Sequence, residues 1–177
     1  NGGLVNGSAT TNENGYATVN LSANGSTPTG HPNGPGFIDI TAETIDKDNN
    51  RITKTTTLLL TTPRAQINVN PTNFNISNGG SETFDVTITD VNGYPMAADT
   101  RIEVSASQGL EASGDIVDLE LGDYFNPGPG TTEFQVTISD ADPDEVVSST
   151  GSFTITVTSP LGETTTRSFD GSRAKTQ

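Results

Sequence analysis

The sequence contains no cysteine and no tryptophan, and it has only one histidine and one methionine. Without cysteine no disulfide can support the fold, so any folded part depends on its hydrophobic core alone. A serine–histidine–acid triad would have to use His31, which lies in a stretch rich in glycine and proline with no Gly-x-Ser-x-Gly sequence beside it. We therefore expect His31 to be an exposed loop residue. The sequence predicts no catalytic residue, no cofactor-binding residue and no enzyme.

Basic residues are also few. The chain has 8 lysines and arginines against 22 aspartates and glutamates, a net charge of −14. From Pro63 onward 5 basic residues stand against 17 acidic ones, so most of the excess lies in the second part. Such a surface repels phosphate backbones and anionic lipids, which argues against nucleic acid and membrane surfaces as partners. Cations remain as candidate ligands.

Long hydrophobic runs are absent. No segment approaches the ~20 apolar residues needed to span a bilayer, so we expect no membrane insertion. No signal peptide is visible, and we expect a mature or excised piece of a longer protein. Small secreted animal domains often need disulfides, so the lack of cysteine favours a bacterial source. The expected location is extracellular or on the bacterial cell surface.

Regularly spaced apolar residues and threonine are what the sequence does contain. Hydrophobic residues make up 30% of the chain, and their regular spacing argues against disorder. Threonine occurs in runs such as 55–57 and 164–166. Because threonine is β-branched, it suits the half-solvated face of a strand. The composition therefore predicts an all-β protein.

Residues 1–62 are predicted to be the C-terminal part of an immunoglobulin-like β-sandwich that is incomplete at its N-terminus. The alternation of apolar and polar residues predicts strands around 17–21 and 38–42 and from Arg51 to Leu60, the last after a turn at 46–50. Three or four strands are too few to close two packed sheets. The inward side chains are expected to be Ala17, Val19, Leu21, Ile38, Ile40 and Ala42.

Residues 63–177 are predicted to be an immunoglobulin-like β-sandwich of about seven strands. A short linker precedes it, and Pro63 stiffens this linker, which limits the orientations of neighbouring modules. The last strand is expected to run from Glu163 to Phe169. The inward residues of the other strands are expected to be Phe74 and Ile76; Phe84, Val86 and Ile88; Ile102, Val104 and Ala106; Ile116, Leu119 and Leu121; Phe134, Val136 and Ile138; and Phe153, Ile155 and Val157.

Two segments resemble the immunoglobulin-like repeats of bacterial invasins and intimins. Residues 88–107 are similar to the front of such a repeat, through Asp90, the turn Asn92-Gly93, Pro95 and the strand residues Ile102 and Val104. Residues 7–42 are similar to its back, through Gly7, Asn14-Gly15, Tyr16 to Val19 and the strand Ile38 to Ala42. After Gly109 the pattern changes, and Tyr124 to Gly130 replaces the expected Asn-Gly-Tyr-Ala turn. The resemblance implies tandem modules of a bacterial surface protein, often an adhesin or its stalk.

Asp46, Asp48 and Asn50 are the first candidate metal ligands. They have the one-three-five spacing of a calcium loop, but Arg51 stands where glycine is expected and Thr57 where a bidentate glutamate is expected. These residue types are also favoured in hairpin turns, which is the alternative interpretation.

The second candidate site is the acidic segment of Asp140, Asp142, Asp144 and Glu145. Four neighbouring carboxylates repel one another, and a hard cation with six to eight oxygen ligands would relieve that repulsion. A solvated acidic loop at one end of the sandwich is the alternative. The sequence therefore predicts at most weak Ca²⁺ binding and no other cofactor.

Tyr94, Tyr124 and Phe125 lie next to turns and are candidates for a glycan platform, or for side chains that cover the edge of the core.

Three functions remain open at this point. The first is a non-enzymatic spacer, stalk or adhesion module of a large bacterial surface protein, with neighbouring immunoglobulin-like modules and a host or cell-surface protein or glycan as partners. The second is a filament subunit that pairs with a like subunit through open sheet edges. The third is an accessory module of a secreted carbohydrate-active enzyme, which rests on fold analogy.

Overall fold

The computed structural model describes residues 3–5, 7–23, 27–107, 109–144 and 147–174. In these residues it contains 13 β-strands and no helix, which confirms the all-β class. Accordingly, these ranges contain no helix that could cross a membrane. The chain divides into two compact units, residues 1–60 and 61–177, which we call unit 1 and unit 2 and describe separately.

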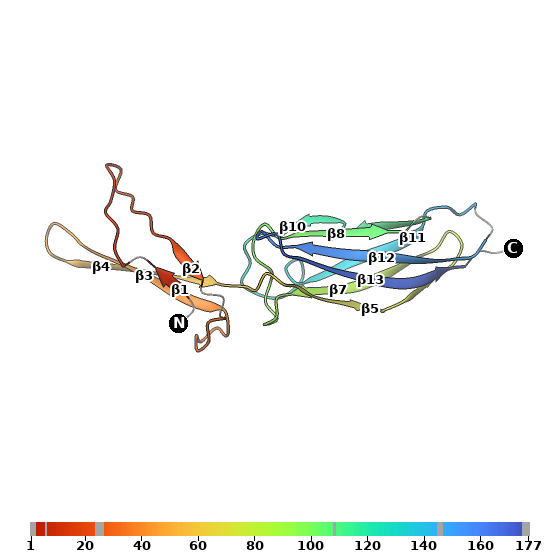
Figure 1. Ribbon diagram of the computed structural model, residues 1–177, viewed down its shortest axis with the longest axis horizontal. Coiled ribbons are helices and arrows are strands. Elements are labelled where there is room, and N and C mark those ends of the chain that lie inside the picture. Colours follow the sequence, from red (N-terminus) through yellow and green to blue (C-terminus); the bar gives the residue numbers. More distant parts are fainter. Residues whose placement is uncertain (1–2, 6, 24–26, 108, 145–146, 175–177) are drawn as a thin grey trace. The chain divides into compact units, whose positions relative to one another are not determined.

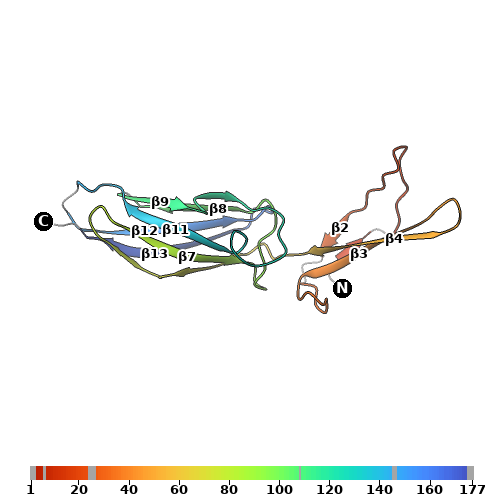
Figure 2. The same ribbon diagram turned by 180° about the vertical axis from the view of Figure 1, so that it is seen from behind.

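Unit 2 is a sandwich of two β-sheets (Figures 1 and 2). In spatial order the first sheet contains β5 (Gln66–Asn70), β7 (Ser81–Thr89), β11 (Glu133–Asp140) and β9 (Leu110–Gly114). The second contains β10 (Asp118–Glu120), β8 (Arg101–Ala106), β12 (Ser149–Thr158), β13 (Thr164–Arg173) and β6 (Phe74–Ile76). With β5, β7, β8, β9, β11, β12 and β13 lettered A to G in chain order, the first sheet has the order A-B-E-D and the second contains C-F-G. This is the arrangement of an immunoglobulin-like sandwich, as predicted.

Alternating apolar residues build the core between these sheets. Every predicted inward residue of unit 2 is buried, except Ala106 and Leu119, which pack against the core while partly exposed. Four phenylalanines gather in its centre, and Gly171 leaves room for one of them, because a Cβ at Gly171 would collide with the ring of Phe74. Each fully buried phenylalanine, leucine or isoleucine side chain stabilises the fold by about 1.5–3 kcal/mol.

The first strand of unit 2 changes from one sheet to the other. β5 pairs antiparallel with β7, and after the cis bond between Asn70 and Pro71 the chain continues as β6, which pairs with β13. The β6–β13 pair is parallel, with Phe74 opposite Gly171. Since the first and last strands run in the same direction, the chain begins unit 2 at one end of the sandwich and leaves it at the other (Figure 1).

The prediction of about seven strands in unit 2 was too low, because its described residues form nine. The two missed strands are β5 and β9. β5 is short and alternates only through Ile67 and Val69, and β9 buries Leu110 alone and ends at Gly114, so neither gave a clear periodic signal. β13 also extends to Arg173, beyond the predicted end at Phe169.

Unit 1 contains two small sheets in its described residues. β1 (Gly3–Val5) pairs with β2 (Leu21–Ala23), and β3 (Phe37–Ile45) pairs with β4 (Arg51–Leu59) as an antiparallel hairpin. The predicted hairpin and its turn are confirmed, since Asn49 has a left-handed φ of 64° and Asp46 N–H donates to Asn50 O. The assignment of this unit as the C-terminal part of a β-sandwich remains a prediction.

The strand predicted around residues 17–21 begins only at Leu21, which is half-buried and starts β2. Residues 17–20 form no strand and are exposed, and Val19 is 44% exposed. Of the other expected inward residues, Ile38 and Ile40 are half-buried and Ala42 is exposed. The physical reason is that the described part of unit 1 has almost no core for these side chains to pack against, since Phe37 is its one buried hydrophobic residue.

Candidate functional site

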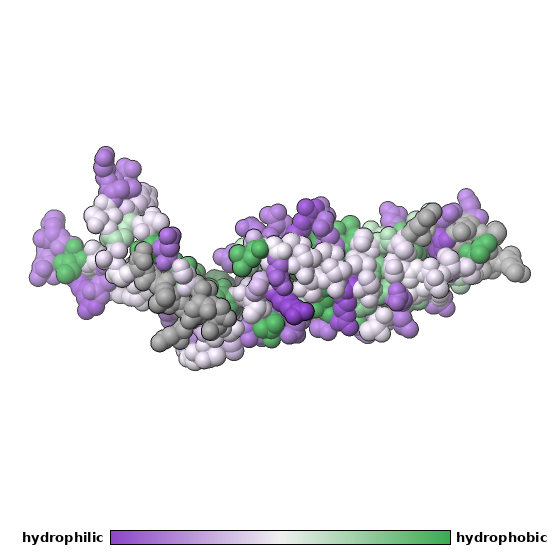
Figure 3. Space-filling model, in the orientation of Figure 1, coloured by the Kyte–Doolittle hydropathy of each residue, from purple (hydrophilic) through white to green (hydrophobic). Residues whose placement is uncertain are grey.

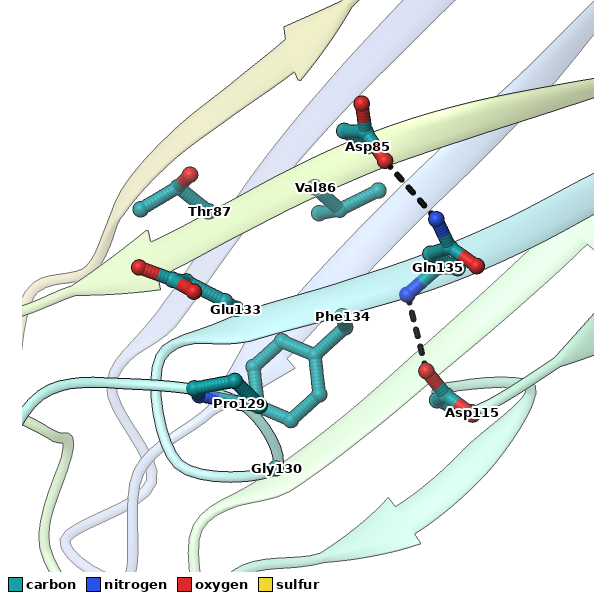
Figure 4. A pocket seen from close by; sticks show the side chains of 9 residues that line it. All are labelled: Asp85, Val86, Thr87, Asp115, Pro129, Gly130, Glu133, Phe134 and Gln135. Carbon is teal, nitrogen blue, oxygen red and sulfur yellow. Dashed lines mark hydrogen bonds between the residues drawn. The ribbon is translucent and has the colours of Figure 1, made fainter.

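A pocket of about 460 Å³ lies on the outer face of unit 2, where β7 and β11 run side by side (Figure 4). Strand alternation explains its polar residues, because Asp85, Glu133 and Gln135 point to solvent while Val86 and Phe134 between them are buried. The pocket is lined by Asp85, Val86, Thr87, Asp115, Pro129, Gly130, Glu133, Phe134 and Gln135.

Gln135 connects two of the three carboxylates in the pocket. Its side-chain Nε2 donates to Asp85 Oδ1 at 3.0 Å, and its backbone N–H donates to Asp115 Oδ2 at 2.9 Å (Figure 4). The Asp115 N–H donates in turn to Gln135 O at 2.9 Å. Glu133 supplies the third carboxylate from the same strand. The arrangement can accept hydrogen bonds from cationic or amide groups, and none of the lining residues is serine, histidine, cysteine or lysine.

A compact turn at residues 128–132 forms one wall of the pocket. Gly128 O accepts from the backbone N–H of Thr132 at 2.9 Å and of Glu133 at 3.0 Å, and Thr132 Oγ1 accepts from Gly128 N–H at 2.9 Å. Thr132 is buried, and Gly130 has a left-handed φ of 75°, which glycine adopts without strain. This wall is the segment that departs from the invasin-type pattern. Sequence reasoning missed the pocket, because its residues come from three separate segments.

Asp140, from the second predicted calcium site, forms a buried ion pair. Its carboxylate lies 3.2 Å from Arg173 Nη1, and the two side chains are 0% and 4% exposed. Asp140 also accepts from the N–H groups of Gly79 at 2.9 Å and Asp142 at 3.1 Å. Arg173 Nη1 donates to Gly109 O at 2.9 Å. The pair therefore joins the end of β11 in one sheet to the end of β13 in the other.

The remaining residues of that predicted site are placed differently. Asp142 and Asp144 are exposed, and Glu145 lies outside the described residues. Within the described part of the chain no group of three or more histidine, cysteine or acidic side chains is gathered for a metal. Weak Ca²⁺ binding stays a prediction.

Asp46, Asp48 and Asn50, the first predicted site, form the turn between β3 and β4. Asp46 Oδ1 accepts from the N–H groups of Asp48 at 2.9 Å and Asn50 at 2.8 Å, and Asn50 Nδ2 donates to Asp46 Oδ2 at 3.1 Å. Asp48 pairs with Lys47 at 2.9 Å. The backbone and side-chain hydrogen bonds from Asn50 lower the pKa of Asp46, because they stabilise its carboxylate. These bonds organise the turn, and metal binding here is untested.

His31 is not the exposed loop residue that the sequence predicts. It lies in a loop, but its side chain is only 15% exposed because its ring stacks on Phe37 with centroids 5.8 Å apart. The N–H of Asn33 donates to His31 Nδ1 at 3.1 Å, so the proton of the neutral ring is on Nε2, 3.4 Å from Asp39 Oδ1. The hydrogen bond from Thr57 lowers the pKa of Asp39, and His31 lowers it further.

We expect unit 1 to lose stability as the pH falls below about 4. Carboxyls with a pKa lowered by folding, here Asp39 and Asp46, stabilise the fold above their unfolded pKa, and this contribution disappears on protonation as the pH falls through the folded pKa. The measurement is the thermal midpoint of unit 1 backbone NMR signals between about pH 6 and about pH 2.5. Asp46→Asn should flatten this profile, and a profile unchanged by that substitution would contradict the expectation.

Of the aromatic residues considered for a glycan platform, Tyr124 and Phe125 lie near the pocket wall in sequence, and Tyr94 does not. Tyr124 is 43% exposed and Phe125 39% exposed, while Tyr94 is half-buried. Tyr94 N–H donates to buried Asp90, whose carboxylate also accepts from Asn92 and from Thr62. Tyr94 therefore belongs to the turn that Asp90 organises.

No family model matches the sequence, and no curated protein matches it. Among solved structures, the periplasmic chaperone SfaE aligns at 8% identity over 63% of this chain and 58% of its own, with a TM-score of 0.47. Domains 4 and 5 of the S-layer protein SbsC align at 14% identity over 93% and 88%, with a TM-score of 0.43. The BIgI domain of beta protein from S. agalactiae bound to CEACAM1 aligns at 15% identity over 64% and 100%, with a TM-score of 0.35. The chain thus spans less than two thirds of the chaperone, and similarities at this level assign no function.

Proposed function

We propose that this chain is a non-enzymatic immunoglobulin-like module of a large bacterial surface protein, of the invasin and intimin type, and acts there as a spacer or adhesion stalk. The observation that carries the proposal is the parallel pairing of β6 with β13. It sends the chain into unit 2 at one end and out at the other, so further modules can follow along one line (Figure 1).

The same pairing determines how unit 2 bears a load. A force applied at its two ends pulls β6 and β13 in opposite directions along the strand axis. The hydrogen bonds between Phe74–Ile76 and residues 171–173 are then loaded together in shear, as are those between β5 and β7. Bonds that must break together resist force better than bonds that open one at a time. This is the mechanical property that a stalk needs.

The outer surface of unit 2 also suits an exposed spacer. Hydroxyl side chains pair across neighbouring strands, with Thr83 and Thr137 at 2.8 Å and Thr154 and Ser168 at 2.8 Å. On the face shown in Figure 3, hydrophobic residues of unit 2 form small separate areas among polar ones. Together with the net charge of −14, such a surface favours solubility outside the cell.

Single-molecule pulling tests the proposal in the full chain. Since the chain has no cysteine, attachment points can be introduced in pairs. Thr61→Cys with Ala174→Cys pulls on opposite ends of unit 2, and Asn78→Cys with Ala174→Cys pulls β6 and β13 apart from one end. We expect a clearly higher unfolding force for the first pair. An equal or lower force would remove the support for a load-bearing stalk.

A second candidate function is a filament subunit assembled by strand pairing between chains. The observation that favours it is the β3–β4 hairpin, which pairs with no other strand among the described residues. Light scattering on the chain at increasing concentration separates the two candidates, because a spacer stays monomeric and a filament subunit associates.

A further inference from the structure

The β3–β4 hairpin of unit 1 has two edges that pair with no other strand in the described part of the chain, and we call these its open edges. Hydrogen bonds at both ends of its ladder show which backbone groups are used inside the hairpin. Leu60 N–H donates to Gly36 O at 2.9 Å, and Asp46 N–H donates to Asn50 O at 2.9 Å. Hydrogen-bonded and non-hydrogen-bonded pairs alternate along an antiparallel ladder. The even-numbered residues therefore bond within the hairpin, and the odd-numbered residues turn their N–H and C=O groups to the open edges.

Most of these edge groups are accessible. Residues 41–45 and 51–56 are all exposed to solvent, so within the described residues these parts of the strands contact mainly each other. Two large apolar side chains next to the turn also face solvent, with Ile45 63% and Ile52 52% exposed. Exposed edge strands with apolar side chains are templates for pairing with another strand.

Charge is divided between the two strands. β3 carries the acidic residues Asp39 and Glu43, and β4 carries the basic residues Arg51 and Lys54. Within the hairpin this division already produces favourable cross-strand contacts, because Arg51 pairs with Glu43 and Thr57 donates to Asp39 at 2.7 Å. A third strand beside β4 would therefore be favoured if it were acidic, and a third strand beside β3 if it were basic.

We propose that the β3–β4 hairpin binds a second copy of this chain, with β4 of one copy pairing antiparallel with β3 of the next. This inference rests on the second function above and names the edges and the partner. The new ladder repeats the register of the hairpin, so Thr41 of one copy lies opposite Thr55 of the other. Lys54 is accommodated opposite Ala42, as it already is within the hairpin.

The pairing is heterologous, since a β3 edge meets a β4 edge. After one contact the first copy keeps its β3 edge and the second keeps its β4 edge, so the contact repeats and gives open chains rather than closed dimers. Pairing of two β3 edges or of two β4 edges would instead give dimers, and it would place like charges side by side.

Two proline variants test this geometry in the full chain. Thr41→Pro removes an N–H from the open edge of β3, and Thr55→Pro removes one from the open edge of β4, without removing a backbone hydrogen bond inside the hairpin. The hydrogen bond between Thr41 Oγ1 and Thr55 Oγ1 at 2.9 Å is lost in both variants. Thr41→Val and Thr55→Val are the matched controls, because they lose the same hydroxyl contact but keep the N–H and suit a strand. The measurement is sedimentation velocity over a concentration series.

We expect wild-type chain and both valine variants to form oligomers that grow with concentration. Each proline variant alone should be monomeric, and their equimolar mixture should stop at a heterodimer, which only folded hairpins can form. Continued growth of both proline variants would overturn this inference and leave the filament function standing. A wild-type chain that is monomeric throughout would overturn both, while the pulling experiment still decides the spacer function.

Salt gives a second test that needs no variant. Because opposite charges meet across the new ladder, raising the salt concentration from about 0.05 M to about 1 M should weaken self-association by about tenfold. Association that strengthens with salt would show that screening of the repulsion between chains of net charge −14, or an apolar contact, outweighs the charge pairs across the ladder, and it would overturn the charge-selected pairing.

Discussion

Replacing Arg173 with methionine is expected to destabilise unit 2 by about 3–5 kcal/mol. The Arg173 side chain is 4% exposed and pairs with a fully buried Asp140 carboxylate. Methionine has a similar length but no charge, so the Asp140 carboxylate would remain buried without the Arg173 cation, and Gly109 O would keep only the N–H of Ala141 as a donor. The change in the free energy of unfolding is measured by urea denaturation followed by far-ultraviolet circular dichroism, because the chain has no tryptophan to report by fluorescence.

Arg101→Met is the matched control for this substitution. Arg101 also forms ion pairs, with Glu103 and Asp118 at 3.1 Å each, but its side chain is 55% exposed. Since exposed pairs contribute about 0–1 kcal/mol, we expect a small effect there. Adding Asp140→Asn to Arg173→Met should recover part of the loss, because it removes the uncompensated charge and keeps an acceptor for Gly79 N–H. Equal losses for Arg173→Met and Arg101→Met would refute this account.

The buried ion pair shows what sequence patterns leave out. The acidic segment from Asp140 onward reads as a solvated loop or a weak cation site, because four acidic residues stand close together in the sequence. In the fold Asp140 points inward at the end of β11, and the cation that it meets is Arg173, which lies beyond the predicted end of the last strand. A pairing across 33 residues between two sheets depends on the complete topology.

The core was predictable because it depends on a short-range rule. Alternation with a period of two places Phe84, Val86 and Ile88 on one face of β7, and the structure buries all three. The same rule failed at Val19, which is 44% exposed, because alternation predicts which face a side chain lies on but not whether another element packs against that face. It also gave no information on the pocket, which needs β7, β11 and the turn at 128–132 to be brought together.

Replacing Phe153 with alanine is expected to destabilise unit 2 by about 3–5 kcal/mol. Phe153 is fully buried at the centre of the core, with its ring 4.8 Å from Phe84, 5.1 Å from Phe169 and 6.1 Å from Phe74 between centroids. Alanine would leave a cavity and remove the aromatic contacts. Because these rings belong to both sheets, the loss should affect the whole unit and give a single earlier transition in urea.

A substitution at the surface separates this packing effect from a general effect of losing an aromatic ring. Phe125 is 39% exposed, and Phe125→Ala should cost less than about 1 kcal/mol. Phe153→Leu keeps most of the volume and should fall between the two, at about 1–2 kcal/mol. If Phe153→Ala and Phe125→Ala destabilise unit 2 equally, packing of the four buried rings does not dominate its stability. Backbone pairing between the strands would then have to supply most of it.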